Sequence, residues 1–190
     1  MIQVLFILAY LAGFLVYVRG SVKKEVKPNL ASWSAWMLGA IASFVVSLKI
    51  GDSAHYIFIS ALDFIICATV VLLNLRTGLW SFLPTMQKVC SVMAATALII
   101  ATIPVIPKHL SVLLLAFSGI SFYPTIATSW AGKSHEPRAA WGLWSLGLAI
   151  TLVGVSMAYT NVWQLVLPSI AFLAHFAVYL TTFRPKTTAI

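Results

Sequence analysis

Charged side chains are scarce in this sequence. Its 190 residues include 12 Lys and Arg and only 4 Asp and Glu, so 8% are charged, while 61% are hydrophobic. A soluble domain carries roughly 25% charged residues, which excludes that class here. In a lipid bilayer the backbone polar groups must be paired within the protein, and continuous apolar runs favour helices over a β-barrel. The sequence therefore predicts an all-α membrane protein.

Cysteines are few, and several functional motifs are missing. Cys67 and Cys90 lie within or beside apolar runs and are interpreted as small buried hydrophobic residues. No CxxC, HExxH or phosphate-loop motif occurs, so the sequence predicts neither a metal site nor a cofactor. The net charge of +8 comes from basic residues in short loops, where they orient a membrane protein rather than bind nucleic acid.

Apolar runs of membrane-spanning length follow one another along the chain. A helix needs about 20 predominantly apolar residues to cross the hydrocarbon core. The predicted spans are 1–18, 30–49, 55–75, 89–106, 109–130, 139–158 and 161–182. The first run lacks the basic leader of a signal peptide and is interpreted as a retained helix. Ten of the twelve Lys and Arg fall on one side of this layout, which predicts an outside N-terminus and a cytoplasmic C-terminus.

Two segments of the chain repeat a pattern. Pro28 precedes the pair Trp33 and Trp36, and Pro137 precedes the pair Trp141 and Trp144. Each second tryptophan is followed by glycine three residues later, and one gap aligns the segments. The sequence thus predicts a three-helix unit over 1–75, a linker helix within 76–108, a parallel second unit over 109–182 and a short cytoplasmic tail over 183–190.

This layout resembles the SWEET and PQ-loop superfamily of small-solute carriers. The stretch from Pro28 to Trp36 is similar to the second-helix signature of small bacterial members, and nicotinamide riboside carriers have a similar Trp-x-x-Trp pair. The resemblance implies a location in the bacterial inner membrane, a solute pocket with Trp36 and Trp144, and hinges at Pro28 and Pro137. Pro124-Thr125 stands where that superfamily has Pro-Gln, so Pro124 is a further candidate hinge, whereas the first helix has no proline.

The four tryptophans admit two interpretations. Within each pair the rings share one helical face, which suits a stacking platform for a flat or cyclic solute. Tryptophan is also common in the aromatic belt at membrane boundaries, and Trp33 and Trp141 lie near the predicted cytoplasmic helix ends. Trp36 and Trp144 lie about 4.5 Å deeper.

Asp63 and His175 are polar residues deep inside predicted spans. An Asp at a helix centre costs about 2.5–3.5 kcal/mol on insertion, so Asp63 is expected to face a cavity and carry a proton or bind a cationic group. Alternatively it is a neutral acid that braces a neighbouring helix. His175 is expected either to line the same cavity from the other half or to be a packing residue. Pro168 predicts a kink, and a possible hinge, in the last span.

The leading hypothesis is a transporter that moves a small solute, such as a sugar, a nucleoside or a vitamin-like compound, by alternating access of two halves. The alternative is a non-transporting scaffold or receptor with the same fold. A polar cavity with Asp63 and the tryptophans facing it favours transport, and a filled centre favours the scaffold. Enzyme activity is not expected, because Ser169 and His175 share a helix without a GxSG motif or a metal cluster. The expected partners are a small-molecule solute, the lipid bilayer and, as an option, further copies of the chain.

Overall fold

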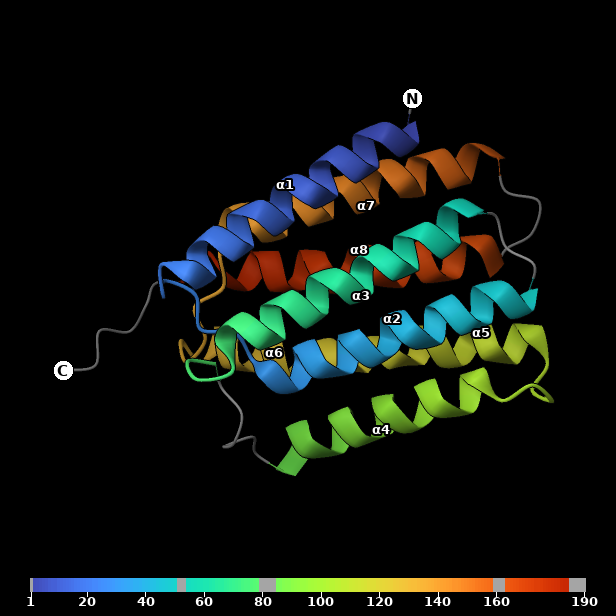
Figure 1. Ribbon diagram of the computed structural model, residues 1–190, viewed down its shortest axis with the longest axis horizontal. Coiled ribbons are helices and arrows are strands. Elements are labelled where there is room, and N and C mark those ends of the chain that lie inside the picture. Colours follow the sequence, from blue (N-terminus) through green and yellow to red (C-terminus); the bar gives the residue numbers. More distant parts are fainter. Residues whose placement is uncertain (1, 51–53, 79–84, 159–162, 185–190) are drawn as a thin grey trace.

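The computed structural model describes residues 2–50, 54–78, 85–158 and 163–184 and consists there of helices without strands (Figure 1). The order is α1 (Ile2–Val22), α2 (Leu30–Ile50), α3 (Ala54–Asn74), α4 (Thr85–Thr102), α5 (Lys108–Phe117), the 3-10 helix η1 (Ser118–Phe122), α6 (Tyr123–Trp130), α7 (Arg138–Ala158) and α8 (Trp163–Thr181). The predicted all-α class is confirmed.

Five of the described helical segments are long and apolar enough to cross a membrane. They are Gln3–Val22, Leu30–Lys49, Ile57–Asn74, Lys108–Trp130 and Arg138–Met157. Two shorter apolar segments, Lys88–Thr102 and Leu165–Thr181, accompany them. This content is compatible with an integral membrane protein.

The fourth helix begins and ends about four residues earlier than the predicted 89–106. It covers Thr85–Thr102, and the chain then turns through a segment with Pro104 and Pro107 before α5. Ile103 precedes a proline, and steric clash with the proline ring disfavours the α conformation at that position. The prediction extended this helix past Pro104 because it followed hydropathy alone.

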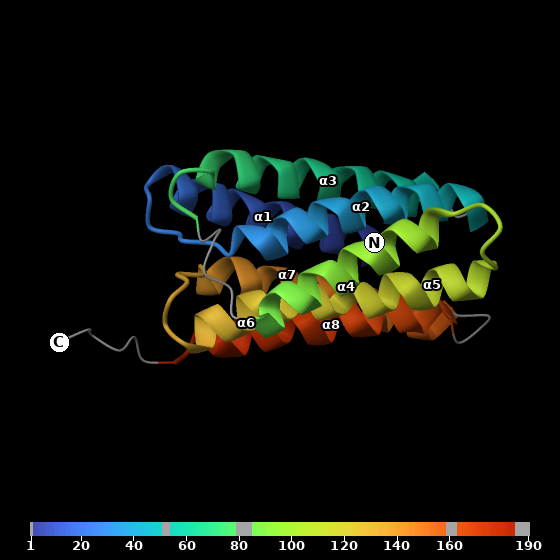
Figure 2. The same cartoon turned by 90° about the horizontal axis from the view of Figure 1, so that it is seen from below.

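The helices form two groups that lie against each other (Figure 2). In the first group α3 packs against both α1 and α2. In the second group α8 packs against both α7 and the segment α5–η1–α6. Between the groups α1 packs along α7, and α2 packs along α5, η1 and α6. The remaining helix α4 lies outside this arrangement, against α2, α5 and η1 (Figure 1).

The fifth predicted span is interrupted in the middle. Its α-helical hydrogen bonding changes to the 3-10 pattern at η1, where the N–H of Tyr123 bonds the carbonyl of Ile120. Pro124 has no N–H to bond that same carbonyl in the α pattern, and this explains the tighter turn before it. At this point the span approaches α8 closely, because a Cβ added to Gly119 would lie 2.8 Å from Ile170 Cγ2.

A glycine also sets the distance between α1 and α7. A Cβ added to Gly13 would lie 2.7 Å from Nε1 of Trp144, and that indole nitrogen donates a hydrogen bond of 3.0 Å to the Tyr10 carbonyl. No side chain larger than hydrogen fits between the helices without displacing the tryptophan.

Replacing Gly13 with Ala is therefore expected to destabilise the protein by about 1–3 kcal/mol, the usual effect of overpacking. Gly→Ala inside an exposed helix normally has the opposite sign. The measurement is unfolding in detergent micelles. Gly147→Ala at the same helix pair is the control, since its added Cβ would find its nearest neighbour, Ala9, at 3.4 Å. A Gly13→Ala variant as stable as the wild type would contradict the close contact.

Candidate functional site

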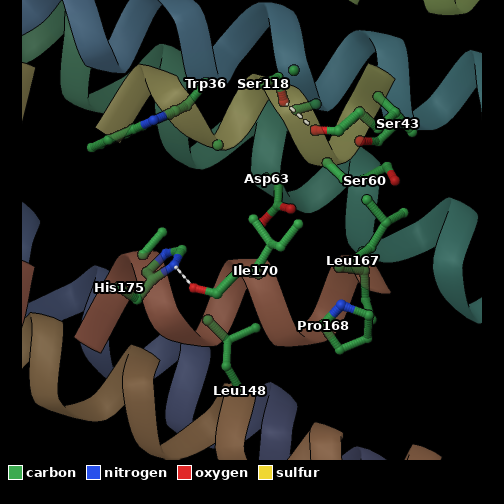
Figure 3. Close-up of a pocket in the computed structure, with 18 of the residues that line it drawn as sticks. Trp36, Ser43, Ser60, Asp63, Ser118, Leu148, Leu167, Pro168, Ile170 and His175 are labelled. Carbon is green, nitrogen blue, oxygen red and sulfur yellow. Dashed lines mark hydrogen bonds between the residues drawn. The ribbon is translucent and has the colours of Figure 1, made fainter. Parts of the chain in front are cut away.

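A cavity of about 1360 Å³ lies between the two helix groups. Its walls come from α1, α2, α3, α5, η1, α7 and α8 (Figure 3). It extends to the end of the bundle where α1 and α5 begin, since the exposed residues Gln3, Lys108 and His109 line it there. Further in, its polar lining includes Ser43, Ser60, Asp63, Ser118 and His175, all drawn in Figure 3.

The other end of the cavity is closed by the four repeat tryptophans, here called the tryptophan cluster: Trp33, Trp36, Trp141 and Trp144. Ring centroids within the pairs are 4.9 Å apart for Trp33–Trp36 and 5.1 Å for Trp141–Trp144. Across the groups, Trp33–Trp144 are 6.0 Å apart and Trp36–Trp141 5.8 Å. Trp33, Trp141 and Trp144 are 2%, 1% and 2% exposed. Trp33 and Trp141 thus lie in the core, whereas an aromatic belt needs rings exposed to lipid.

Glu136, in the loop between α6 and α7, joins this closed end. Its Oε2 accepts hydrogen bonds from the Tyr17 hydroxyl at 2.8 Å and from the Trp141 indole at 2.9 Å. The first bond connects α1 to the loop before α7. Burial raises the pKa of the Glu136 carboxyl to about 7, although these two hydrogen bonds oppose the shift.

Backbone and side-chain hydrogen bonds reinforce the closed end. The loops α1–α2 and α6–α7 meet through two bonds between Lys27 and His135, of 3.1 and 3.2 Å. Ser32 donates its hydroxyl to the Ser121 carbonyl at 2.8 Å, from α2 to η1. Each of these contacts crosses from one helix group to the other, so the two groups cannot separate at this end without breaking them.

Asp63 lies on the cavity wall near the middle of α3 (Figure 3). Its Oδ1 accepts a hydrogen bond from the Tyr10 hydroxyl of α1. The Tyr10 ring lies 6.2 Å from the Trp144 ring, which links the carboxyl to the tryptophan cluster.

His175 lines the same cavity from α8 (Figure 3). Its Nδ1 is 2.8 Å from the Ala171 carbonyl, which can only accept, so Nδ1 carries the proton. In a neutral imidazole Nε2 is then a hydrogen-bond acceptor. The ring also lies 5.4 Å from Trp141 and 4.9 Å from Phe122.

The four prolines named as hinges occupy different positions. Pro28 and Pro137 precede α2 and α7 rather than standing inside them. Pro124 begins α6 directly after η1. Pro168 lies inside α8 and lines the cavity, so it is the one of the four in a helix interior.

Sequence analysis missed Tyr10, Tyr17 and Glu136. Tyr10 and Tyr17 are seven residues apart in α1 and therefore share a helical face, and each hydroxyl donates to a carboxyl group. That spacing was the available signal. The residues to which these tyrosines donate lie 53 and 119 positions away in the chain, beyond the reach of any local pattern.

In the part of the chain that is described, no three His, Cys, Asp or Glu side chains gather as a metal site requires. Comparisons with protein-family models, curated proteins and solved structures find no match for this chain.

Proposed function

We propose that this protein is a small-solute transporter that works by alternating access of two three-helix units, residues 1–75 and 109–182. The observation that carries the proposal is the cavity between the two helix groups, which is open at one end and closed at the other. Polar groups on its walls and aromatic rings at its closed end are the elements from which solute pockets are built. A scaffold has no need of a cavity with a carboxyl group inside.

Packing that is equivalent in the two groups supports the repeat. In each group the third helix, α3 or α8, packs against the other two. If α1 corresponds to α5–η1–α6 and α2 corresponds to α7, the contact of α1 with α7 is equivalent to the contact of α5–η1–α6 with α2. The ring distances in the tryptophan cluster are also nearly equal at equivalent positions: 4.9 and 5.1 Å within the two pairs, and 6.0 and 5.8 Å between the pairs. Equivalent halves can adopt equivalent arrangements on either side of the membrane, which is the basis of alternating access.

The proposed layout has seven spans, with the shorter helices α4 and α8 included. The closed end carries most of the Lys and Arg and is assigned to the cytoplasm, so the present arrangement opens outward. Transport requires the contacts of Lys27, Glu136 and the tryptophan cluster to separate while the outer end closes. The interruption at η1 and Pro168 in α8 are the positions at which such a change needs the least loss of helical hydrogen bonding.

Uptake into proteoliposomes tests the function. Purified protein is reconstituted, exposed to a mixture of small metabolites, and the solutes retained are identified by mass spectrometry. We expect at least one solute to accumulate above the level in empty liposomes. Ser43→Trp, which places a large ring on the cavity wall, should abolish that accumulation while the protein remains folded. If the folded protein neither binds a solute nor causes one to accumulate in the liposomes, the scaffold hypothesis would be favoured.

Reporter fusions test the orientation separately. A reporter active only outside the cytoplasm is expected to be active at the N-terminus and inactive at the C-terminus, because of the uneven distribution of Lys and Arg. A second reporter that matures only in the cytoplasm serves as the control and should give the reverse pattern. A cytoplasmic N-terminus would contradict both the orientation and an odd number of spans.

A further inference from the structure

Asp63 is the single carboxyl group among the described residues that line the cavity. Its Oδ1 is bonded to the Tyr10 hydroxyl, and the carboxyl group lies beside open space between α3 and α8 (Figure 3). An ionised carboxylate accepts several hydrogen bonds. One hydroxyl therefore leaves most of its capacity to a group that enters the cavity.

Tyr10, which bonds this carboxyl group, belongs to a chain of aromatic rings. The Tyr10 ring lies 5.2 Å from Phe6 and 6.2 Å from Trp144, and Trp144 lies 6.3 Å from the His175 ring. The faces of such rings carry negative partial charge and attract cations. His175 adds an acceptor at Nε2, because its Nδ1 proton is bonded to Ala171. Carboxylate, ring faces and imidazole nitrogen all favour a positively charged donor.

Basic side chains lie away from this depth. Lys108 and His109 line the cavity only at its mouth, as the first exposed residues of α5. The Lys49 ammonium is bonded to the Ile103 carbonyl and the Ser111 hydroxyl, each at 2.9 Å, at the same end of the bundle. Among the described residues, no basic side chain is hydrogen-bonded or ion-paired to Asp63, and the space beside it is left for a cation from solution.

We propose that the cavity binds an organic cation, with a protonated or quaternary amine against Asp63 and an apolar or aromatic body against Trp36 and Trp144. This inference rests on the transport function proposed above and names its substrate class. The cavity of about 1360 Å³ exceeds the 300–1,000 Å³ typical of small-molecule pockets, so the body of the solute fits together with water.

Matched cations and neutral analogues test the substrate class. Calorimetry on the purified protein at neutral pH compares three pairs: tryptamine with tryptophol, phenethylamine with 2-phenylethanol, and choline with 3,3-dimethylbutan-1-ol. In each pair the shape is nearly constant and the positive charge is removed. The choline pair changes the charge alone, since its quaternary nitrogen carries no N–H donor. We expect at least one cation to bind about tenfold or more tightly than its neutral partner.

Variants assign the preference to the carboxyl group. Asp63→Asn keeps the side-chain shape and should abolish the preference for the cation, while Glu25→Gln removes an exposed carboxyl group outside the cavity and should preserve it. Circular dichroism and gel filtration establish that both variants are folded. If Asp63→Asn does not fold, Asp63→Glu should retain the preference with altered affinity.

Other outcomes overturn the inference. Neutral analogues that bind as tightly as the cations, failure of all three cations to bind, or an Asp63→Asn variant that retains the preference would each contradict it. If the Asp63→Asn variant keeps its preference for the cation but its uptake loses pH dependence, Asp63 would be a proton carrier, which also contradicts the inference. These results leave the transport assay intact: accumulation of a neutral solute refutes only the substrate class, whereas absence of any uptake refutes the transport function.

Discussion

Replacing Trp141 with Ala is expected to lower the free energy of unfolding by about 3–5 kcal/mol, the range found when a buried large aromatic side chain is truncated. The ring is 1% exposed and contacts the other three members of the tryptophan cluster and His175. Its N–H also bonds Glu136 at 2.9 Å, so truncation removes a hydrogen bond and leaves a cavity at the interface of the two groups. The measurement is denaturant unfolding in a fixed detergent.

Trp130 provides the control for this prediction. Its ring is 58% exposed and has the Arg184 guanidinium 4.5 Å from its centroid. Trp130→Ala should cost less than about 1 kcal/mol, because it removes one exposed contact and no core packing. Equal losses for the two variants would show that Trp141 faces lipid and that the two groups do not meet through the cluster.

The second large effect concerns the pH dependence of the closed end. Burial raises the pKa of Glu136 from 4.5 to about 7 in the closed arrangement. Once the end opens and the carboxyl group meets water, its pKa returns toward the ordinary value. The closed arrangement therefore binds the proton more tightly. Its stabilisation is complete below the ordinary pKa and is lost as the pH rises through about 7.

Opening of this end should accordingly increase with pH, by about tenfold or more between pH 5 and pH 8. Thiol labelling measures it in a background without Cys67 and Cys90. Ala140 is fully buried beside Trp141, and its neighbour Ala139 is exposed. The labelling rate of the Ala140→Cys variant is divided by that of the Ala139→Cys variant. Because thiol ionisation affects both rates, it cancels, and the ratio measures how often the closed end opens.

Glu136→Gln gives the decisive comparison. The amide is neutral at every pH, and its carbonyl can still accept from Tyr17 and Trp141. In the Gln variant, the ratio of the two labelling rates should stay low and independent of pH. Lys27 and His135 also lie at this end, but their side chains are exposed. A Gln variant that retains the wild-type pH dependence would assign the effect to another group. Glu136 would then not control the opening of this end.

Some features of the fold were open to prediction because their causes are local. The scarcity of charge predicts a lipid environment, and runs of apolar residues predict the helices α1, α2, α3 and α7 within a few residues. The i, i+3 spacing places Trp33 with Trp36 and Trp141 with Trp144 on one face each. Where the prediction failed, proline geometry was decisive: Pro104 ends α4 early, and Pro124 converts the preceding turn into η1.

The site depended on contacts that no local pattern contains. Sequence analysis placed Asp63 and His175 deep in their helices, but depth alone does not determine the direction in which a side chain points. Three contacts follow from the packing of α1 against both α3 and α7. Tyr10 bonds Asp63, Glu136 turns inward to Tyr17, and the two tryptophan pairs pack together. Membrane helices with similar apolar surfaces can pack in many ways, and close contacts at residues such as Gly13 select among them. The sequence by itself therefore determined the helices and the candidate polar residues and predicted a lipid environment. Only tertiary packing decided which of these residues meet, because their partners lie far apart in the chain.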